Sequence, residues 1–381
     1  MGTPLLQDRR GMALPLALFA LVITSAMMMG VFYVGRLEQR MGGGSVRKLQ
    51  AFEAAEAGAA RVLNNWVAGN YNNMAVGATS TVALDSTGLA GGASYTASVY
   101  KMSATKYLVQ SNGQLRLGGG RVAARQRVVR LVGLNLPNLN IRAAVSTRGG
   151  IQVSGSSQIS GTDHIPTGWG GVCPAAGPAQ AGIRDSSGSI SASGACSGYS
   201  CVTGSPQVAT DPTLNTNAFT VFGDLTFADL AAMANITTAG GTWNGLAPAV
   251  SGGNCNTAVN TNWGDPLNIA GACANYFPII YSSGNIRLTG GYGQGILLVN
   301  GDLDMSGGVE FFGPVIVMGE VRSTGTGGHI TGGVMSRDAN LTISTFTGNS
   351  VVDYSGCAVQ RALRGSARAK PLDTRGWAQV Y

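Results

Sequence analysis

A long uncharged apolar stretch near the start of the chain passes directly into a stretch with helical periodicity. Residues 12–34 carry no charged side chain, and a helix of this length spans roughly 34 Å, enough for a bilayer core of ~30 Å. From Val46 to Trp66, apolar residues recur at three- and four-residue steps, the period of an amphipathic helix. The pattern therefore predicts one helix over residues 12–66 that leaves a membrane and enters a folded domain.

Two features of the sequence bear on the continuity of this helix and on its orientation in the membrane. Gly42–Gly44 stand in its middle, and each glycine costs roughly 1 kcal/mol relative to alanine in a helix interior, so we expect a local melt or kink there. Charges flank the apolar run on both sides, with Arg9 and Arg10 before it and Arg36 and Arg40 after it. The positive-inside rule alone therefore leaves the orientation in the membrane undecided.

Residues 67–136 change from a helical to an alternating pattern. Runs rich in Val, Tyr and Thr are bounded by turn residues such as Ser111-Asn112-Gly113 and Gly118–Gly120. These runs occupy residues 79–84, 94–102, 106–111 and 121–134. They predict a small antiparallel sheet packed on the helix, followed by a linker over residues 135–140.

A repeat follows further along the chain. Each unit has a short apolar run, a turn and an alternating run, and the glycines that open the second halves are about 17 and 18 residues apart, at Gly284, Gly301 and Gly319. Inward ladders of residues such as Ile286 and Leu303 would suit a parallel β-solenoid. Residues 144–155 match the same template. We expect solenoid-like repeats over residues 141–160 and 277–350, with an antiparallel meander of hairpins as the alternative.

Composition supports a mainly β C-terminal part. Among 381 residues, 58 are glycine and 11% are charged, which is typical of a β- and turn-rich chain with room for more than one domain. The predicted fold class is therefore α+β: a membrane helix with a small antiparallel sheet, then a mainly β repeat domain. Residues 161–276 are predicted to be a Cys-rich loop insert with one helical piece at 225–234, and exposed loops of this kind often bind partners.

The cysteines indicate an oxidising compartment. An even number beyond a membrane anchor predicts disulfides, and the candidates are Cys173, Cys196, Cys201, Cys255, Cys273 and Cys357. The local bridges Cys196–Cys201 and Cys255–Cys273 fit the spacing, but six cysteines allow 15 full connectivities. No C-x-x-C pair occurs and the histidines are His164 and His329, so no metal site and no cofactor are predicted.

The N-terminal segments resemble a known family. A basic pair ends at Gly11 before the apolar helix, and Leu37–Gly42 and Ala51–Gly58 follow at a fixed spacing. Together they resemble the PilX N-terminal domain of minor pilins in type IV pilus biogenesis, over residues 9–65. The motif residues that carry the resemblance are Leu37, Glu38, Arg40, Met41, Phe52, Glu53, Glu56 and Gly58.

The resemblance implies a processing step and an assembly surface. A prepilin peptidase would remove a leader of residues 1–11 by cutting after Gly11, which leaves Met12 as the mature N-terminus. The mature helix would then pack against the helices of other minor pilins and of the major pilin. The apolar residues expected on that surface are Leu16, Phe19, Val22 and Phe32.

Leu16 distinguishes this chain from major pilins, which have a glutamate at the fifth residue after the cut. A carboxylate there is thought to pair with a neighbour's terminal amine in the apolar filament core, where an unpaired charge is costly. A subunit that lacks it suits a priming or tip position. The resemblance thus implies a single-pass inner-membrane protein with its C-terminal part in the periplasm, found at the pilus tip or cell surface after assembly, where a large tip adhesin is a further expected partner.

Other functions remain open from the sequence. The anchor could display a surface adhesin or binding module, could belong to a tip pseudopilin of type II secretion, or could be an ordinary membrane anchor for a periplasmic domain. Asp163 and His164 could form half of a nucleophile-activating pair, but no G-x-S-x-G elbow accompanies them, and a solvated loop histidine is the expectation. His329 is expected in a solenoid turn. The chain is not predicted to be an enzyme.

The charged clusters have ordinary explanations. The acidic residues of the repeat region are expected in solvated turns rather than in a calcium site, and they are Asp302, Asp304, Glu310 and Glu320. Basic residues cluster on one strand face, at Arg121, Arg125 and Arg127, and in a basic tail over residues 351–381, at Arg361, Arg364, Arg368, Lys370 and Arg375. No aromatic residues interleave with these arginines to stack bases, so nucleic-acid binding is not expected and the tail is predicted to be disordered.

Overall fold

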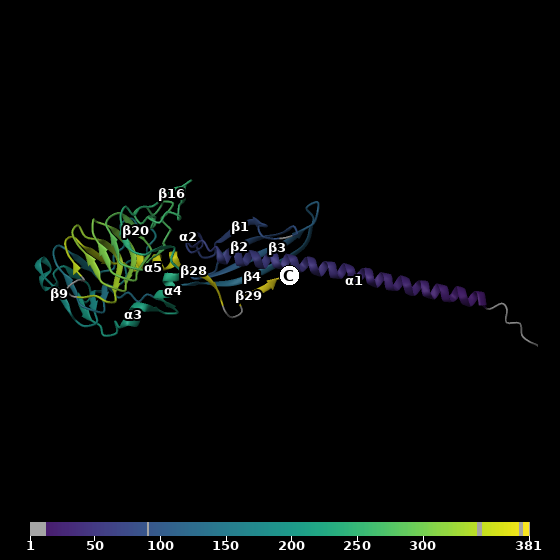
Figure 1. Ribbon diagram of the computed structural model, residues 1–381, viewed down its shortest axis with the longest axis horizontal. Helices are drawn as coiled ribbons and strands as arrows, with labels where there is room; N and C mark the ends of the chain where they lie inside the picture. The colour runs from purple at the N-terminus through teal and green to yellow at the C-terminus, as the bar shows by residue number, and fades with distance from the viewer. Residues whose placement is uncertain (1–12, 90, 341–344, 373–375, 381) are drawn as a thin grey trace, which may run out of the picture.

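The computed structural model describes residues 13–89, 91–340, 345–372 and 376–380. One helix, α1 (Ala13–Asn64), projects from a head that contains all the strands (Figure 1). The helix runs without a break through Gly42–Gly44, so the predicted melt or kink is wrong. Once a helix is nucleated, each further residue adds a hydrogen bond. The long helical segments on both sides of the three glycines therefore keep them helical despite their low helix propensity.

The first part of the head is an antiparallel sheet that packs on the second half of α1, as predicted (Figure 1). A short helix, α2 (Ala68–Tyr71), lies between α1 and this sheet. The strand order is β1-β2-β3-β4-β28, and β29 also pairs with β4. The strands are β1 (Thr79–Asp85), β2 (Ala93–Lys101), β3 (Lys106–Arg116), β4 (Val122–Asn135), β28 (Arg368–Pro371) and β29 (Trp377–Val380).

Two sequence predictions fail in this sheet. Ser111-Asn112-Gly113 lies inside β3 and is not a turn. The predicted disordered tail is also wrong, because residues 351–371 form β27 (Val351–Tyr354), α5 (Gly356–Ser366) and β28. The chain returns from the second part of the head to the first, where β28 and β29 satisfy the backbone groups of β4. A polar, basic sequence gave no sign of this long-range pairing.

The second part of the head contains two sheets of parallel strands. In the larger sheet the order is β10-β7-β27-β25-β23-β21-β18-β14, and β5, β8, β11 and β20 pair with strands beside this path. Its strands are β5 (Ala143–Thr147), β7 (Gln158–Ser160), β8 (Ala181–Asp185), β10 (Val202–Thr203), β11 (Val208–Thr210), β14 (Ile236–Thr238), β18 (Ile279–Ser282), β20 (Tyr292–Gln294), β21 (Ile296–Val299), β23 (Glu310–Val317), β25 (His329–Ser336) and β27.

The smaller parallel sheet has the order β15-β19-β22-β24-β26-β6-β9. Its strands are β6 (Ile151–Val153), β9 (Ile190–Ala192), β15 (Gly241–Trp243), β19 (Ile286–Leu288), β22 (Leu303–Met305), β24 (Val321–Ser323) and β26 (Thr345–Phe346). Its register follows the repeat: Ile286 is paired with Leu303, and Leu303 with Val321. The upstream segment 144–155 joins the same arrangement, because β5 pairs with β25 and β6 pairs with β26.

The predicted loop insert is only partly a loop. Residues 161–276 contribute β8, β9, β10 and β11 toward one end of the two parallel sheets and β14 and β15 at the other. The expectation of a loop domain outside the sheets is therefore wrong for these strands, whose short apolar runs were hidden among Gly and Ser. The remaining elements of the segment are η1 (Gly194–Tyr199), α3 (Thr216–Thr220), β12 (Val221–Phe222), β13 (Leu225–Thr226), α4 (Phe227–Ala232), β16 (Val250–Ser251) and β17 (Asn254–Cys255).

Apolar side chains fill both faces of the larger parallel sheet. One core lies between the two sheets, where Leu297 and Val315 meet Leu303 and Val321. A second core lies on the opposite face, where Ile296 and Ile316 pack with Ala358 and Ala362 of α5 and with Trp169. Burial on both faces explains why these strands appear in the sequence as continuous apolar runs such as Ile296–Val299.

Candidate functional site

The first half of α1 is an apolar surface that nothing in the described structure covers. Its most apolar window has a mean hydropathy of 2.1 and none of it is buried, and by length and composition α1 is the helix among the described residues that could cross a membrane. The side chains predicted for the assembly surface are bare, with exposed fractions of 63% for Leu16, 66% for Phe19, 64% for Val22 and 74% for Phe32. Gly11 and Met12 lie outside the described residues.

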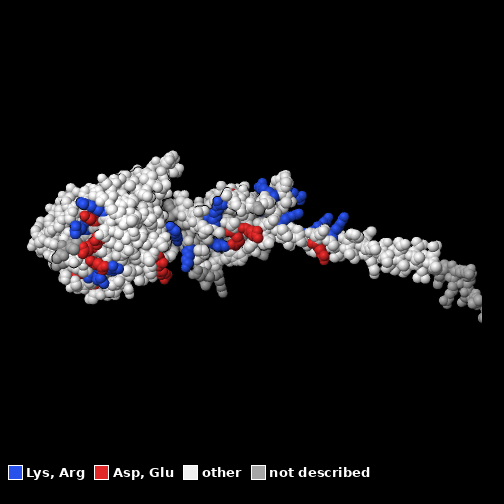
Figure 2. All heavy atoms as spheres, viewed as in Figure 1, with Lys and Arg blue, Asp and Glu red and all other residues white. Residues whose placement is uncertain are grey.

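The second half of α1 is bound to the antiparallel sheet by small residues. Ala51, Ala54, Ala55, Gly58 and Ala59 are buried on the sheet side. All of these except Ala59 belong to the Ala51–Gly58 motif, so the structure places this segment of the predicted site on the sheet. Leu37, Glu38, Arg40 and Met41, in contrast, are exposed on the projecting helix, and Figure 2 shows charged side chains where the bare apolar half ends. The two motif segments therefore occupy different surroundings.

Glycines on both elements permit this close approach. A Cβ on Gly58 would lie 2.4 Å from the Tyr95 ring and 2.4 Å from Ser111 Oγ. A Cβ on Gly113 of β3 would lie 2.0 Å from the carbonyl oxygen of Ala51 and 2.4 Å from the backbone nitrogen of Ala55. Helix backbone and strand backbone therefore touch at Gly113, which is why a glycine stands in the middle of a strand.

Polar contacts complete the docking of α1. The Glu56 carboxylate forms an ion pair with Arg130 of β4 and accepts a hydrogen bond from the indole of Trp377 in β29. The Phe52 and Trp377 rings meet edge to face, with centroids 6.2 Å apart. Glu53 is exposed. The motif residues Phe52 and Glu56 thus hold the C-terminal strand against the helix, a contact that no sequence pattern indicated.

A second ion pair fixes the edge of the sheet to the helix. Arg61 Nη1 lies 3.1 Å from Asp85 Oδ2. The Asp85 carboxylate also accepts hydrogen bonds from the backbone nitrogen and the hydroxyl of Thr87 and from the Tyr95 hydroxyl. These hydrogen bonds, that of the Thr87 backbone first, lower the pKa of Asp85. Its carboxylate is therefore ionised at neutral pH and available to Arg61.

Asn72 joins the two parts of the head. It is 4% exposed, and its amide nitrogen donates to the carbonyls of Arg364, at 2.5 Å, and Ala367, at 2.9 Å. Its side-chain oxygen accepts from the Trp66 indole, and its backbone carbonyl accepts from Lys101 Nζ at 2.6 Å. Burial lowers the pKa of Lys101, helped by the nearby Arg364. The side chain and backbone of Asn72 together thus connect the segment after α1, the antiparallel sheet and the end of α5.

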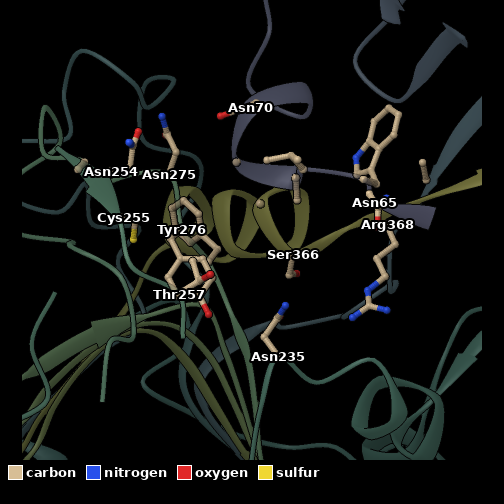
Figure 3. A pocket seen from close by; sticks show the side chains of 18 of the residues that line it. Asn65, Asn70, Asn235, Asn254, Cys255, Thr257, Asn275, Tyr276, Ser366 and Arg368 are labelled. Carbon is tan, nitrogen blue, oxygen red and sulfur yellow. The ribbon is translucent and has the colours of Figure 1, made fainter. Parts of the chain in front are cut away.

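A cleft of about 930 Å³ lies beside this junction (Figure 3). Segments far apart in the chain line it: residues 63–70 at the end of α1, Asn235, the loops around 253–257 and 272–277, and residues 365–369 at the end of α5 and beyond it. Its lining includes Tyr276, and burial raises the pKa of Tyr276 to about 12, so this hydroxyl is protonated at neutral pH. No sequence motif indicated this cleft, because segments far apart in the chain form it.

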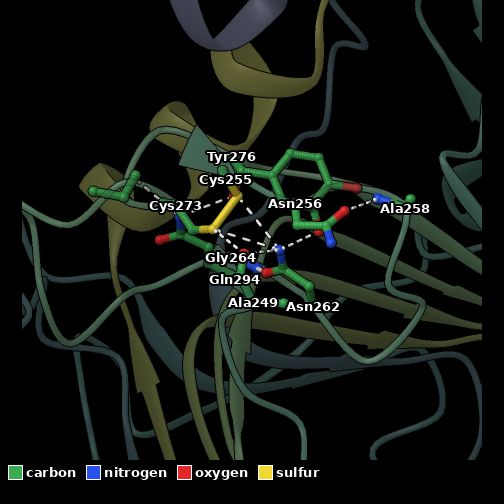
Figure 4. The surroundings of a disulfide bond; sticks show 10 residues. Ala249, Cys255, Asn256, Ala258, Asn262, Gly264, Cys273, Tyr276 and Gln294 are labelled. Carbon is green, nitrogen blue, oxygen red and sulfur yellow. Dashed lines mark hydrogen bonds between the residues drawn. A yellow bond between two sulfur atoms is a disulfide. The ribbon is translucent and has the colours of Figure 1, made fainter. Parts of the chain in front are cut away.

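Three disulfides are present, and they include the two local pairs that fitted the spacing, Cys196–Cys201 and Cys255–Cys273. The third, Cys173–Cys357, connects the segment after β7 to the start of α5. Around Cys255–Cys273, the Asn262 amide donates to the carbonyls of Asn256 and Ala249 and lies 3.4 Å from both sulfurs (Figure 4). The bridge and this buried amide hold one wall of the cleft.

The histidines and their acidic neighbours have structural surroundings. The Asp163 carboxylate accepts hydrogen bonds from the backbone nitrogens of Gly177, at 2.5 Å, and Gly356, at 2.8 Å. It therefore supports the start of α5. His164 is exposed, and His329 opens strand β25 rather than lying in a turn, which corrects that prediction. Among the described residues, no group of three or more potential ligands could hold a metal ion.

The remaining charged residues lie on two surfaces. Arg121, Arg125 and Arg127 are exposed at or near β4. Figure 2 shows a mixed row of acidic and basic side chains on the distal part of the head. Along the smaller parallel sheet, the Asp302 carboxylate accepts hydrogen bonds from the Asn285 amide and from the Glu320 backbone nitrogen, and Asp304 lies 3.8 Å from Arg287. Asp304 and Glu310 lie in strands β22 and β23, not in turns.

The basic residues of α5 and β28 are ordered, in contrast to the disordered tail that the sequence predicts. Arg361 is half-buried, and its guanidinium lies 4.3 Å from the centroid of the Trp169 ring and 5.1 Å from that of Phe277. Burial lowers the pKa of Arg361. Arg364 and Arg368 are exposed, and Arg368 donates to the carbonyl of Met233 at 3.0 Å. Arg375 lies outside the described residues.

Comparisons with known proteins identify no family. No family model matches the chain, and no curated protein matches it. Among solved structures, the competence-associated pilin ComZ from Thermus thermophilus is similar at a TM-score of 0.25 and 12% sequence identity, over 88% of this chain and 97% of that one. This similarity is too low to establish a shared fold or a shared role, so the pilin-like reading depends on the N-terminal segments themselves.

Proposed function

We propose that the chain is a minor-pilin-like subunit of a type IV pilus, anchored in the inner membrane by α1, that primes assembly or occupies the pilus tip. The observation that carries the proposal is the division of α1 into a bare apolar half and a half docked on an antiparallel sheet. A helix apolar on all sides and uncovered needs either lipid or other apolar helices around it. A subunit that moves from membrane to filament meets both.

The proposed mechanism involves packing without a chemical reaction of the chain's own. After prepilin peptidase cuts behind Gly11, the surface that includes Leu16 and Phe19 would pack against other minor pilins and the major pilin. Leu16 supports a position at the start or tip, because it offers no carboxylate to a neighbour's terminal amine. The size of the head also favours the tip, since two further sheets and α5 lie beyond the docked helix.

The second part of the head would serve as a rigid extension. We propose that its two parallel sheets form a β-solenoid that presents loops of residues 161–276 away from the filament. The parallel register, in which Ile279 pairs with Ile296 and Leu297 with Val315, supports this arrangement over an antiparallel meander. Disulfides favour the periplasm for this part, because such bonds persist in oxidising compartments. A tip adhesin is a further proposed partner.

Mass spectrometry of the membrane protein tests the proposal directly. In cells with active prepilin peptidase, the mature chain should begin at Met12, and replacing Gly11 by a bulky residue should block the cut. Recovery of the uncut N-terminus in such cells would refute the pilin reading. Deleting the gene and counting surface pili tests the priming role, since a priming subunit should be needed for normal pilus number.

A membrane-anchored adhesin or binding module is the second candidate, and the cleft of about 930 Å³ between the two parts of the head favours it. Normal pilus number and retraction after deletion, with loss of surface attachment, would support the adhesin over the priming subunit. A type II secretion tip pseudopilin remains the third alternative, because it would also lack the glutamate. Neighbouring secretion ATPase and secretin genes would favour it over the pilus.

A further inference from the structure

The cleft beside Asn72 has a lining of unusual chemistry. Its volume of about 930 Å³ is in the range at which proteins enclose small organic ligands, and such sites often lie between domains. Six asparagines line it, all with exposed side chains: Asn64, Asn65, Asn70, Asn235, Asn254 and Asn275. An amide both donates and accepts hydrogen bonds, so a group of them suits a ligand rich in hydroxyls.

Several of these amides retain free hydrogen-bonding groups. The side-chain oxygen of Asn235 accepts from the backbone nitrogen of Ile279 at 2.9 Å, which leaves its amide nitrogen directed toward Ser366 (Figure 3). The oxygen of Asn275 is 3.5 Å from Arg361 Nη2, and its amide nitrogen makes no hydrogen bond within the described part of the chain. The Asn70 side chain has no hydrogen bond to any described residue. These groups are available to a ligand.

The charges around the cleft have one sign. The lining contains Arg368 and no aspartate or glutamate. Arg361 and Arg364 lie on the same helix that ends at the cleft, and within the described ranges neither they nor Arg368 form an ion pair. Buried Lys101 lies behind them with a backbone carbonyl as its acceptor. Arginines that no carboxylate neutralises attract an anionic group.

The walls are held in place before any ligand arrives. The Gln294 amide nitrogen lies 3.0 Å from each of the carbonyls of Ala274 and Tyr276, and the Cys255–Cys273 bridge closes the same loop (Figure 4). On the opposite side, Asn72 ties residues after α1 to the end of α5. A preformed site loses less conformational entropy on binding than a mobile one.

We propose that this cleft binds an acidic oligosaccharide, with the asparagine amides on its hydroxyls and Arg368 on a carboxylate. The amides provide the match to sugar hydroxyls, and the uncompensated arginines provide the preference for an acid. The inference goes beyond the proposed function and does not depend on it, because binding requires neither a membrane nor a filament. Loss of pili on deletion would leave it unaffected.

Isothermal titration calorimetry of the full chain in uncharged detergent micelles tests the inference. The probes are tetragalacturonate and the neutral tetrasaccharide cellotetraose. We expect saturable binding of the acidic probe, at least tenfold tighter than that of the neutral one and weaker at high salt, because a charge-assisted hydrogen bond outweighs a neutral one. Equal affinity for the two probes, or no saturable binding of tetragalacturonate, would overturn it.

Matched variants locate the site. Arg368→Gln should weaken binding of the acidic probe about tenfold and leave any neutral binding unchanged, whereas Arg322→Gln, an exposed arginine on the distinct strand β24, should change neither. Asn70→Ala should weaken both probes, and because its side chain bonds to no described residue it should not alter folding. Tight acidic binding that survives both Arg368→Gln and Asn70→Ala would place the ligand elsewhere and refute the assignment.

Discussion

The contact between Gly113 and α1 offers the sharpest test of how the helix is held. In Gly113→Ala the new Cβ would lie 2.0 Å from Ala51 O and 2.4 Å from Ala55 N. Both neighbours are helix backbone, so no side-chain rotation can relieve the clash, and α1 and β3 must separate. Gly58→Ala meets the Tyr95 ring and Ser111 Oγ instead, and alanine also favours the helix that contains it by about 1 kcal/mol, so its net effect should be smaller.

The magnitude follows from two opposing terms. Overpacking in a well-packed site costs typically about 1–3 kcal/mol, and the rigid backbone neighbours place Gly113→Ala at the upper end. Replacing glycine by alanine also restricts the unfolded chain, which stabilises by about 0.4–1 kcal/mol. The net loss is therefore about 2 kcal/mol, which corresponds to roughly a 30-fold change in an opening equilibrium.

Hydrogen exchange with peptide resolution measures this change in the full chain, because it reports the opening of each element separately. Protection in β3 and in residues 51–64 of α1 should fall about 30-fold in Gly113→Ala, while the two parallel sheets keep theirs. The matched control is Gly118→Ala, where a Cβ meets nothing within 4 Å. Protection in Gly113→Ala equal to that of the control would refute the close-approach argument.

Three further predictions concern the rest of the head. Replacing Cys173 and Cys357 by serine opens a link across a sequence separation of 184, and chain entropy gives a loss of about 5 kcal/mol, seen as a lower urea midpoint. Asn72→Ala leaves buried carbonyls without their donor, at about 1–3 kcal/mol, and should speed hydrogen exchange in β28. Burial raises the pKa of the Asp353 carboxyl, and His164 opposes this shift. The stability that the protonated carboxyl contributes is therefore complete below its unfolded pKa and is lost as pH rises through its folded pKa. Asp353→Asn should therefore raise the unfolding temperature at pH 7 and leave it unchanged near pH 3.

Local patterns predicted the elements well where neighbouring residues decide the structure. The helix over residues 12–66 is observed as Ala13–Asn64, and the strand predicted at 79–84 is observed as Thr79–Asp85. The errors arose where a residue serves a distant contact. The preference of glycine for turns predicts a turn at Gly113, whereas its role in the structure is to let a helix backbone approach.

The candidate site likewise has one part that local sequence patterns could predict and one part that they could not. The apolar surface with Leu16 could be predicted, because uninterrupted apolarity over a bilayer length is a local property. The cleft could not, because its lining joins residues 63–70, Asn235, the loops around 253–257 and 272–277, and residues 365–369. Asparagines scattered through a polar sequence have no period or spacing that reveals a shared cavity.

The sequence by itself determined the long apolar helix, the antiparallel strands, the repeat near residue 284 and the supply of cysteines, since hydrophobic period and turn chemistry act over a few residues. Only the tertiary structure decided that β28 and β29 return to β4, that strands from residues 161–276 extend both parallel sheets, and that Cys173 pairs with Cys357. The physical reason is that backbone pairing between distant strands and the burial of small residues against a helix depend on complementary surfaces. Such surfaces exist only once the chain has folded.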